Sequence, residues 1–139
     1  MRDPSAELRA GRAVLVAAVN ERQEFGDFGE RVAAHRLEAS GMRVVARKVR
    51  TRGGEIDLVA YDGEDVVFVE VRTRHAGPGL AAQSLMPVKL RRMWQCAMDY
   101  CEAVGLAPER ARIDVISIDV GPRGETASIE HFRGIEIPG

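Results

Sequence analysis

The stretch Gly54-Glu-Ile-Asp-Leu-Val-Ala-Tyr61, followed closely by Val66-Val-Phe-Val-Glu-Val-Arg72, decides the fold of this chain. Both runs have the residue types that favour strands, and the turn-forming residues Asp62-Gly-Glu-Asp65 lie between them. Two such runs separated by a short glycine-containing turn predict an antiparallel β-hairpin.

The tight-turn register, with residues 63–64 as a two-residue loop, sets Asp57 opposite Glu70 and Glu55 opposite Arg72. The alternate positions are apolar and should form core: Ile56 with Val71, Leu58 with Val69, and Ala60 with Val67. Two opposed carboxylates repel each other unless a cation lies between them, and Mg²⁺ fits that need. The alternatives that stay open are that one acid points to solvent, that it pairs with Arg72 or Arg74, or that a longer loop changes the register. A slip of one residue would put the two acids on opposite faces.

Length and composition predict one globular domain. The chain has 139 residues, of which 45% are hydrophobic and 29% charged, and this is ordinary usage for such a domain. We assign residues 25–139 to that domain and residues 1–24 to an N-terminal extension, with a helix over residues 5–22 as one interpretation. No apolar run reaches the roughly 18 residues of a membrane span. The apolar run at residues 13–19 is short, and Asp3 and Glu7 lie where a signal peptide has its positive region, so a cytoplasmic location without a membrane partner is expected, with export as the alternative.

Basic side chains are concentrated in two segments without any Asp or Glu, residues 39–54 and 71–98. These segments flank the predicted hairpin, so a positive surface should surround its acidic centre. Such a surface is typical of proteins that hold a phosphodiester backbone. We expect the nucleic-acid contacts to come from Arg47, Lys48, Arg50, Arg52, Arg74 and Arg92. The alternative is that these side chains only keep the protein soluble.

The periodicity of the remaining chain predicts further elements on both sides of the hairpin. Apolar stripes at helical spacing predict helices over residues 25–40 and 87–104. Strands are predicted over residues 42–50, 112–120 and 128–137, and a loop over residues 73–86. The order αβββαβ with a terminal strand predicts an α/β fold whose mixed central sheet is flanked by helices.

This order, with Asp57 on the second strand and Glu70 on the third, resembles the restriction endonuclease-like fold of PD-(D/E)XK nucleases, which includes Holliday-junction resolvases. Within that fold, the chain is similar to the YraN-type family of uncharacterised bacterial proteins. The matching residues are Gly26-Asp-Phe-Gly-Glu30, Gly53-Gly-Glu-Ile-Asp-Leu58, Phe68-Val-Glu-Val-Arg-Thr-Arg74, Lys89 with Arg92, and Arg112-Ile-Asp-Val115. The resemblance covers about residues 25–137.

The resemblance implies metal-dependent hydrolysis of phosphodiesters in DNA, with branched DNA as one class of substrate. Asp57 and Glu70 would hold Mg²⁺ or Mn²⁺, with the carbonyl of Val71 as a third ligand. Glu30 resembles the extra acid of resolvase-type members, which could bind a metal through water. Its alternative role is that of a solvated glutamate near a helix N-terminus.

Arg72 departs from the nuclease signature, which has lysine at this position. An arginine stays protonated and can only donate hydrogen bonds and stabilise negative charge. Lys89 on the following helix is the candidate to supply the missing group, and a plain surface lysine is the alternative. The expected catalytic set is therefore Asp57, Glu70, Arg72, Lys89 and Glu30, with Asp57, Glu70 and Glu30 at the metal.

Three function classes follow from these residues. The first is an endonuclease-like hydrolase that uses Mg²⁺ or Mn²⁺. The second is a non-catalytic nucleic-acid-binding protein with a vestigial nuclease site, which Arg72 favours. The third is a protein–protein adaptor, whose sheet edge at residues 128–137 would form a homodimer.

Overall fold

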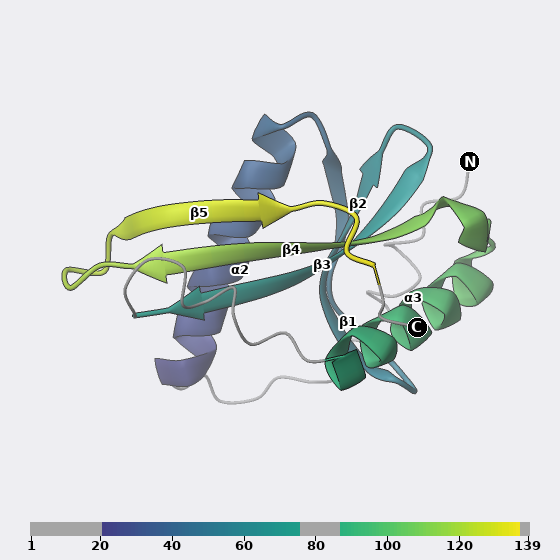
Figure 1. Ribbon diagram of the computed structural model, residues 1–139, viewed down its shortest axis with the longest axis horizontal. Coiled ribbons are helices and arrows are strands. Elements are labelled where there is room, and N and C mark those ends of the chain that lie inside the picture. Colours follow the sequence, from purple (N-terminus) through teal and green to yellow (C-terminus); the bar gives the residue numbers. More distant parts are fainter. Residues whose placement is uncertain (1–20, 76–86, 137–139) are drawn as a thin grey trace.

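The computed structural model describes residues 21–75 and 87–136, in which five strands form one sheet (Figure 1). The elements follow the order α2 (Glu21–Ala39), β1 (Arg43–Thr51), β2 (Gly54–Asp62), β3 (Asp65–Arg74), α3 (Pro87–Val104), a 3-10 turn (Pro108–Arg110), β4 (Ala111–Val120) and β5 (Thr126–Phe132). This is the expected αβββαβ order with a terminal strand.

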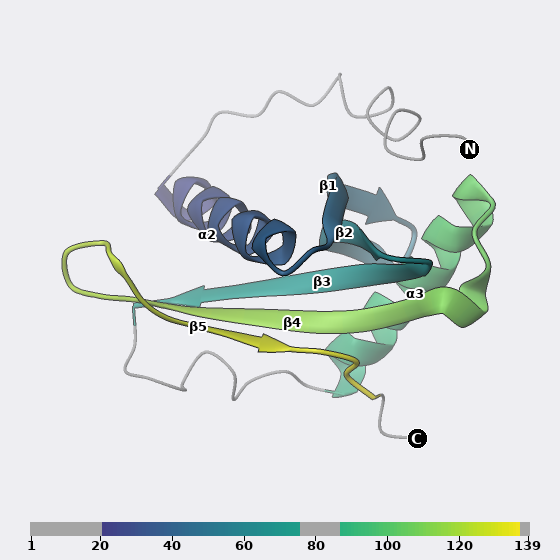
Figure 2. The same ribbon diagram turned by 90° about the horizontal axis from the view of Figure 1, so that it is seen from above.

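The sheet is mixed and lies between the two helices. Its strands are arranged β1-β2-β3-β4-β5, with β3 parallel to β4 and every other neighbour antiparallel. Figure 2 shows α2 on one face of the sheet and α3 on the other. Leu37 of α2 packs in one buried cluster with Val67, and Tyr100 of α3 packs in a second with Phe68. The α/β class with a helix-flanked mixed sheet is therefore confirmed.

The β2–β3 hairpin has the expected tight-turn register, which pairs Asp62 with Asp65 and Leu58 with Val69. Ile56 is buried in the core as expected, but the expected face is wrong. It was predicted on one face with Leu58 and Ala60, paired with Val71, and it belongs instead to the cluster under α3. The regular pairing with β3 ends at Leu58, and beyond it Ile56 pairs only with Val49 of β1, which lies in that same cluster.

Most element boundaries agree with the sequence prediction within one residue, and the larger differences concern α2, β3 and β5. Helix α2 begins at Glu21, β3 continues through Arg74 into the predicted loop, and β5 is Thr126–Phe132 where residues 128–137 were expected. Strand β5 ends early because Gly134 takes a left-handed backbone with φ of 62°. The bounds of α3 are those predicted. Residues 1–20, which hold most of the expected N-terminal helix, and residues 76–86 lie outside the described part.

Neither of the two helices in the described residues has the length and hydropathy needed to cross a membrane.

Candidate active site

Asp57 and Glu70 lie directly after the last regular pair of the β2–β3 hairpin. The side chain of Asp57 accepts a hydrogen bond from the main-chain N–H of Val71, at 2.8 Å. Glu70 is almost fully buried, with 7% of its surface exposed. Burial, reinforced by the negative charge of Glu70, raises the pKa of Asp57 to about 8. Asp57 therefore holds a proton at neutral pH unless a cation compensates its charge.

Glu30 reaches the same centre from α2. An added Cβ at the preceding residue, Gly29, would collide with the hydroxyl of Thr73, so glycine lets the helix approach β3 closely. Glu30 is 8% exposed, and burial raises its pKa despite the nearby positive charge of Lys48. Its negative charge also contributes to the raised pKa of Asp57. The third expected acid is thus electrostatically coupled to the pair.

Lys48 has a different position from the one expected of a nucleic-acid contact. Its Nζ lies 2.5 Å from Asp27 Oδ1 and 3.5 Å from Glu30 Oε2. The backbone of Lys48 is left-handed, with φ of 49°, which is unusual for a residue other than glycine. The sequence did not indicate this ion pair, because a lysine on a β-strand was expected to face solvent.

Lys89 contacts the carboxylate pair from the opposite helix. Its Nζ lies 2.5 Å from Glu70 Oε1, although about half of the Lys89 side chain stays exposed. Arg72 follows Glu70 by two positions on β3 and is partly buried, so it leaves the strand on the same face. The structure therefore brings Asp57, Glu70, Glu30 and Lys89 together, with Arg72 on the adjoining part of β3.

The protein supplies only some of the ligands that a small hard cation would need at this centre. Among residues 21–75 and 87–136, no three His, Cys, Asp or Glu side chains are grouped as a metal site. Mg²⁺ commonly takes one or two carboxylates and fills its other positions with water or phosphate oxygens. Asp57 and Glu70 meet that need, and their mutual repulsion favours a cation. Glu30 is occupied by Lys48, so its part would be indirect.

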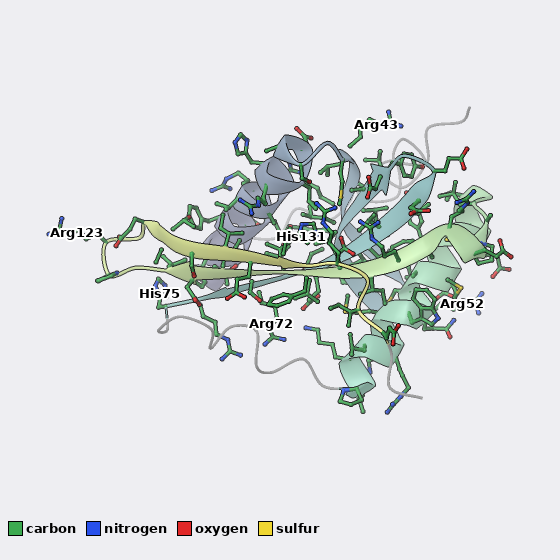
Figure 3. All side chains as sticks on the ribbon, turned by 45° about the horizontal axis from the view of Figure 1, so that its top comes forward. Arg43, Arg52, Arg72, His75, Arg123 and His131 are labelled. Atoms are coloured by element: carbon green, nitrogen blue, oxygen red, sulfur yellow. The ribbon has the colours of Figure 1, made fainter. Side chains whose placement is uncertain are left out.

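The expected nucleic-acid contacts divide into two groups. Arg47, Arg50, Arg52 and Arg92 are exposed, whereas Arg74 and Lys48 are partly buried. Figure 3 shows Arg52 beside α3, whereas Arg123, which the basic segments do not include, lies at the distal tip of the β4–β5 hairpin. The exposed basic side chains of this set thus come from β1, its turn into β2, and α3, and Arg50 and Arg52 lie beside the last turns of α3.

Glu55 differs from its expected partnership with Arg72. It lies opposite Arg50 in the β1–β2 ladder, and the two side chains form an ion pair at 3.2 Å. The reason is the end of the β2–β3 ladder at Leu58, after which the start of β2 has only β1 as its paired neighbour.

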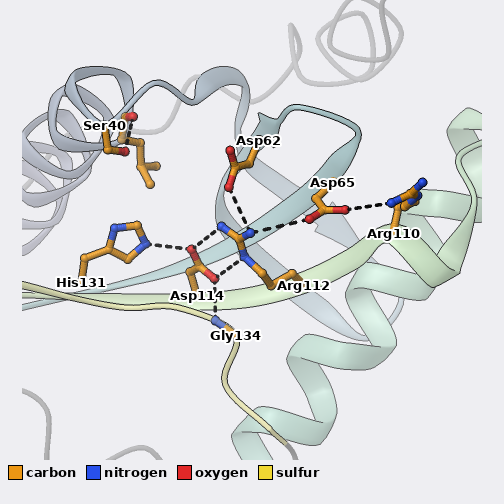
Figure 4. Close-up of polar contacts among 9 residues, drawn as sticks. Ser40, Asp62, Asp65, Arg110, Arg112, Asp114, His131 and Gly134 are labelled. Atoms are coloured by element: carbon orange, nitrogen blue, oxygen red, sulfur yellow. Dashed lines mark hydrogen bonds and ion pairs between the residues drawn. The ribbon is translucent and has the colours of Figure 1, made fainter.

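A second buried carboxylate, Asp114 of β4, was not recognised from the sequence as the centre of a network (Figure 4). Arg112 donates to both of its oxygens, from Nε at 3.0 Å and from Nη2 at 3.2 Å. Its other partners are His131 Nε2 at 2.7 Å and the N–H of Gly134 at 2.9 Å. These hydrogen bonds outweigh burial and hold the pKa of Asp114 below its usual value.

Comparison with known proteins gives one consistent family. The profile of the uncharacterised protein family UPF0102 matches residues 29–118. A UPF0102 protein of Kineococcus radiotolerans is 40% identical over 119 residues, which cover 84% of this chain and 97% of the relative. The relative in Roseiflexus castenholzii is 46% identical over 113 residues, covering 80% and 91%. The relative in Mycolicibacterium vanbaalenii is 36% identical over 126 residues, covering 86% and 99%. The matched range includes Glu30, Asp57, Glu70, Arg72 and Lys89.

Proposed function

Since the chain belongs to the UPF0102, or YraN-type, family of uncharacterised proteins, we propose that it is a metal-dependent endonuclease that hydrolyses phosphodiester bonds in DNA. Mg²⁺ or Mn²⁺ is the proposed cofactor, and branched DNA is the proposed substrate class. The name of the family carries no activity, so the proposal stands on the candidate active site.

The observation that carries the proposal is the buried pair Asp57 and Glu70. Burial and the repulsion from Glu70 raise the pKa of Asp57 to about 8. The pair therefore costs stability, and core packing does not require two acids at these positions. A pair built only for stability would be expected to have more donors. A pair that binds a divalent cation exchanges the proton of Asp57 for the metal, which removes the repulsion.

Each residue around the pair has a role that its chemistry allows. Asp57 and Glu70 would hold the metal, and the bound metal would polarise the phosphate and acidify a water molecule. Lys89 keeps about half of its side chain exposed while its ammonium contacts Glu70, so it can stabilise the negative charge that develops on the phosphate. Arg72 supplies a permanent positive charge on the same strand. Lys48 holds Glu30 in place beside Asp57.

The test is cleavage of labelled duplex, branched and single-stranded DNA by the purified protein with Mg²⁺, with Mn²⁺, or with a chelator. We expect cleavage only with a metal ion. Glu70→Gln should abolish cleavage while DNA binding survives, because the substitution removes a metal ligand and one negative charge. Intact DNA in every condition, together with normal binding, would reject the enzyme.

A binding assay tests the basic surface separately. Arg50→Gln combined with Arg52→Gln should flatten the dependence of DNA affinity on salt by about one unit per lost phosphate contact. Arg123→Gln is the matched control, because Arg123 lies at the distal tip of the β4–β5 hairpin (Figure 3). Equal slopes for the double variant and the wild type would show that DNA does not follow this surface.

Arg72 favours a second candidate, a nucleic-acid-binding protein without catalysis. An arginine cannot act as a base toward water at any ordinary pH, so the nuclease signature lacks one function. The two candidates differ in the cleavage assay alone, since both require DNA binding. A homodimer through β5, the edge strand of the sheet, is a further proposal that the mass of the protein in solution would test.

A further inference from the structure

A pocket of about 520 Å³ adjoins the candidate active site, between the β1–β2 turn and the first turns of α3. Lys89, which contacts Glu70 at 2.5 Å, is also part of the pocket wall. The pocket is also lined by Gly53, Gly54, Glu55, Val88, Arg92, Met93 and Cys96, and the carboxylate of Glu55 is held in an ion pair by Arg50. The pocket therefore begins one side chain away from the carboxylate pair, and its size is that of a site for a small organic group.

The part of the pocket between the β1–β2 turn and α3 is formed by two glycines and by the buried Met93 and Cys96. Gly53 lies so close to α3 that an added Cβ would stand 3.2 Å from Cys96 Sγ. Gly54 has φ of 139°, a backbone conformation that favours glycine. On the side of the β1–β2 turn, the pocket wall therefore consists of the main chain of Gly53 and Gly54. The buried side chains of Met93 and Cys96 line it on the side of α3. No aromatic ring lines the pocket within the described residues.

Val88 at the pocket is the sole large hydrophobic side chain classed as exposed in the described part of the chain, with 51% of its surface accessible. Lys89 follows it directly on the same helix, and Arg92 comes one turn later. Phosphate binding alone would explain the positive charges of Lys89 and Arg92, but it would not explain an exposed valine beside them. A group with an apolar face and phosphates on either side would use all three.

We infer that this pocket receives an unpaired nucleobase of the DNA, next to the phosphate at the carboxylate pair. The inference rests on the proposed function and narrows its substrate class. The faces of a nucleobase are apolar, and its flanking phosphates match Lys89 and Arg92. A base in a continuous duplex is stacked and paired, and freeing it costs a few kcal/mol. DNA with unpaired nucleotides, at a branch or a single-stranded flap, therefore binds best.

The test compares two DNA molecules of the same sequence, one fully paired and one with a single-stranded flap. The first unpaired position of the flap carries 2-aminopurine, and binding is measured in a chelator so that no cleavage occurs. We expect the flap DNA to bind about tenfold more tightly, the scale of one favourable base contact. The 2-aminopurine emission should rise, because the base leaves its neighbours and meets main chain and aliphatic groups.

Three variants locate the effect. Val88→Gln keeps the net charge and should remove both the tenfold preference and the rise in emission. Arg91→Gln and Arg92→Gln each remove one exposed positive charge from α3, but only Arg92 lines the pocket. Arg91→Gln should weaken both DNA molecules equally, whereas Arg92→Gln should weaken the flap DNA more.

Two results would overturn the inference, and they differ in what they say about the proposed function. Equal affinity for both DNA molecules with unchanged emission, or a Val88→Gln protein that keeps the preference, rejects the base pocket and leaves the endonuclease to its own cleavage assay. Failure to bind either DNA at low salt rejects the proposed function and the base pocket together.

Discussion

Asp57 and Asp114 lie on two strands of one sheet, yet their surroundings are nearly opposite. Asp114 accepts hydrogen bonds from Arg112, His131 and the N–H of Gly134. Asp57 accepts one from the N–H of Val71 and has a second acid, Glu70, as its neighbour. The pKa of Asp114 is lowered by its donors, while burial and Glu70 raise the pKa of Asp57 to about 8.

The comparison teaches how to separate a structural carboxylate from a functional one. Burial opposes the charge of both groups, so burial alone does not distinguish them. The number and charge of the hydrogen-bond donors around each carboxylate distinguish them. Asp114 has a complete set of partners from the protein, which fixes β4 to β5 and to the hairpin turn. Among the described residues, Asp57 has one hydrogen-bond donor, the N–H of Val71, and a second acid beside it. Paired acids with few donors from the protein are what a metal-binding centre needs.

The largest difference should appear when each carboxylate is removed. Asp114→Ala removes the acceptor that the partly buried Arg112 shares with the nearly buried His131 and the N–H of Gly134, and should lower the free energy of unfolding by about 3 kcal/mol, even though Arg112 keeps Asp62 as a partner. Asp57→Asn should cost far less, because it relieves repulsion from Glu70. Urea denaturation of the metal-free proteins measures both changes. If Asp114→Ala were as stable as Asp57→Asn, the two centres would not differ in kind.

Metal ions should stabilise the protein through one centre only. Mn²⁺ at about 100 times its dissociation constant should add about 2.7 kcal/mol to the free energy of unfolding, by mass action on the folded state. Asp57→Asn should abolish this gain, whereas Asp62→Asn, which changes an acid paired with Arg112, should keep it. Thermal melts with and without Mn²⁺ measure the gain. A full gain in Asp57→Asn would assign the metal to another site.

The two centres should also respond to pH in opposite directions. Asp57 has a raised pKa in the folded state, so the stability is complete below about pH 4, where the unfolded chain is protonated too, and is lost as the pH rises toward 8 and only the unfolded chain ionises. Asp114 has a lowered pKa, so its contribution is present at neutral pH and is lost as the pH falls below about 4.

The metal-free wild type should therefore lose about 2 kcal/mol of unfolding free energy between pH 6 and 8 that Asp57→Asn retains, given about 1.4 kcal/mol for each unit of pH in which only the unfolded chain is ionised. Chemical denaturation across this pH range is the measurement. Parallel curves for the two proteins would show that Asp57 does not titrate in this window.

The smallest expected difference concerns the two arginines of these centres. Arg112→Lys loses the fork that donates to both oxygens of Asp114 and should cost about 1–2 kcal/mol of unfolding free energy.

Arg72→Lys restores the nuclease signature and should leave cleavage equal or raise it by up to about tenfold, because lysine keeps the charge and can assist a water molecule. A large loss of cleavage in a stably folded Arg72→Lys protein would show that the guanidinium itself is required.

The sequence was sufficient for those features that depend on local pattern. The β2–β3 register follows from a turn two residues long, and the bounds of α3 follow from Pro87 and an apolar stripe. Asp57 and Glu70 meet for the same reason. Their partners Lys89 and Glu30 were named from the family resemblance, because no periodicity relates two helices to the same pair of strands.

The missed features depend on contacts between distant segments or on an irregular backbone. The left-handed conformation of Lys48 is not signalled by its residue type, so its ion pairs with Asp27 and Glu30 could not be foreseen. His131 reaches Asp114 across 17 positions of sequence. The expectations for Ile56 and Glu55 were wrong because β2 is no longer paired with β3 before Leu58. The alternation of residues along a strand does not show where its pairing with the neighbouring strand ends.

The chain topology has a consequence for the order of folding. The segment β1-β2-β3 is a meander of adjacent strands, whereas β3 and β4 are parallel and are separated by residues 75–110. Closing that longer loop costs more entropy, so the meander should form first in the folding transition state. Substitutions at Val59 should then slow folding, and those at Ile118 should mainly speed unfolding, as φ-value measurements can determine. Asp57 and Glu70 thus come together before β3 pairs with β4, and the repulsion between the two acids arises early, while the chain is still being ordered.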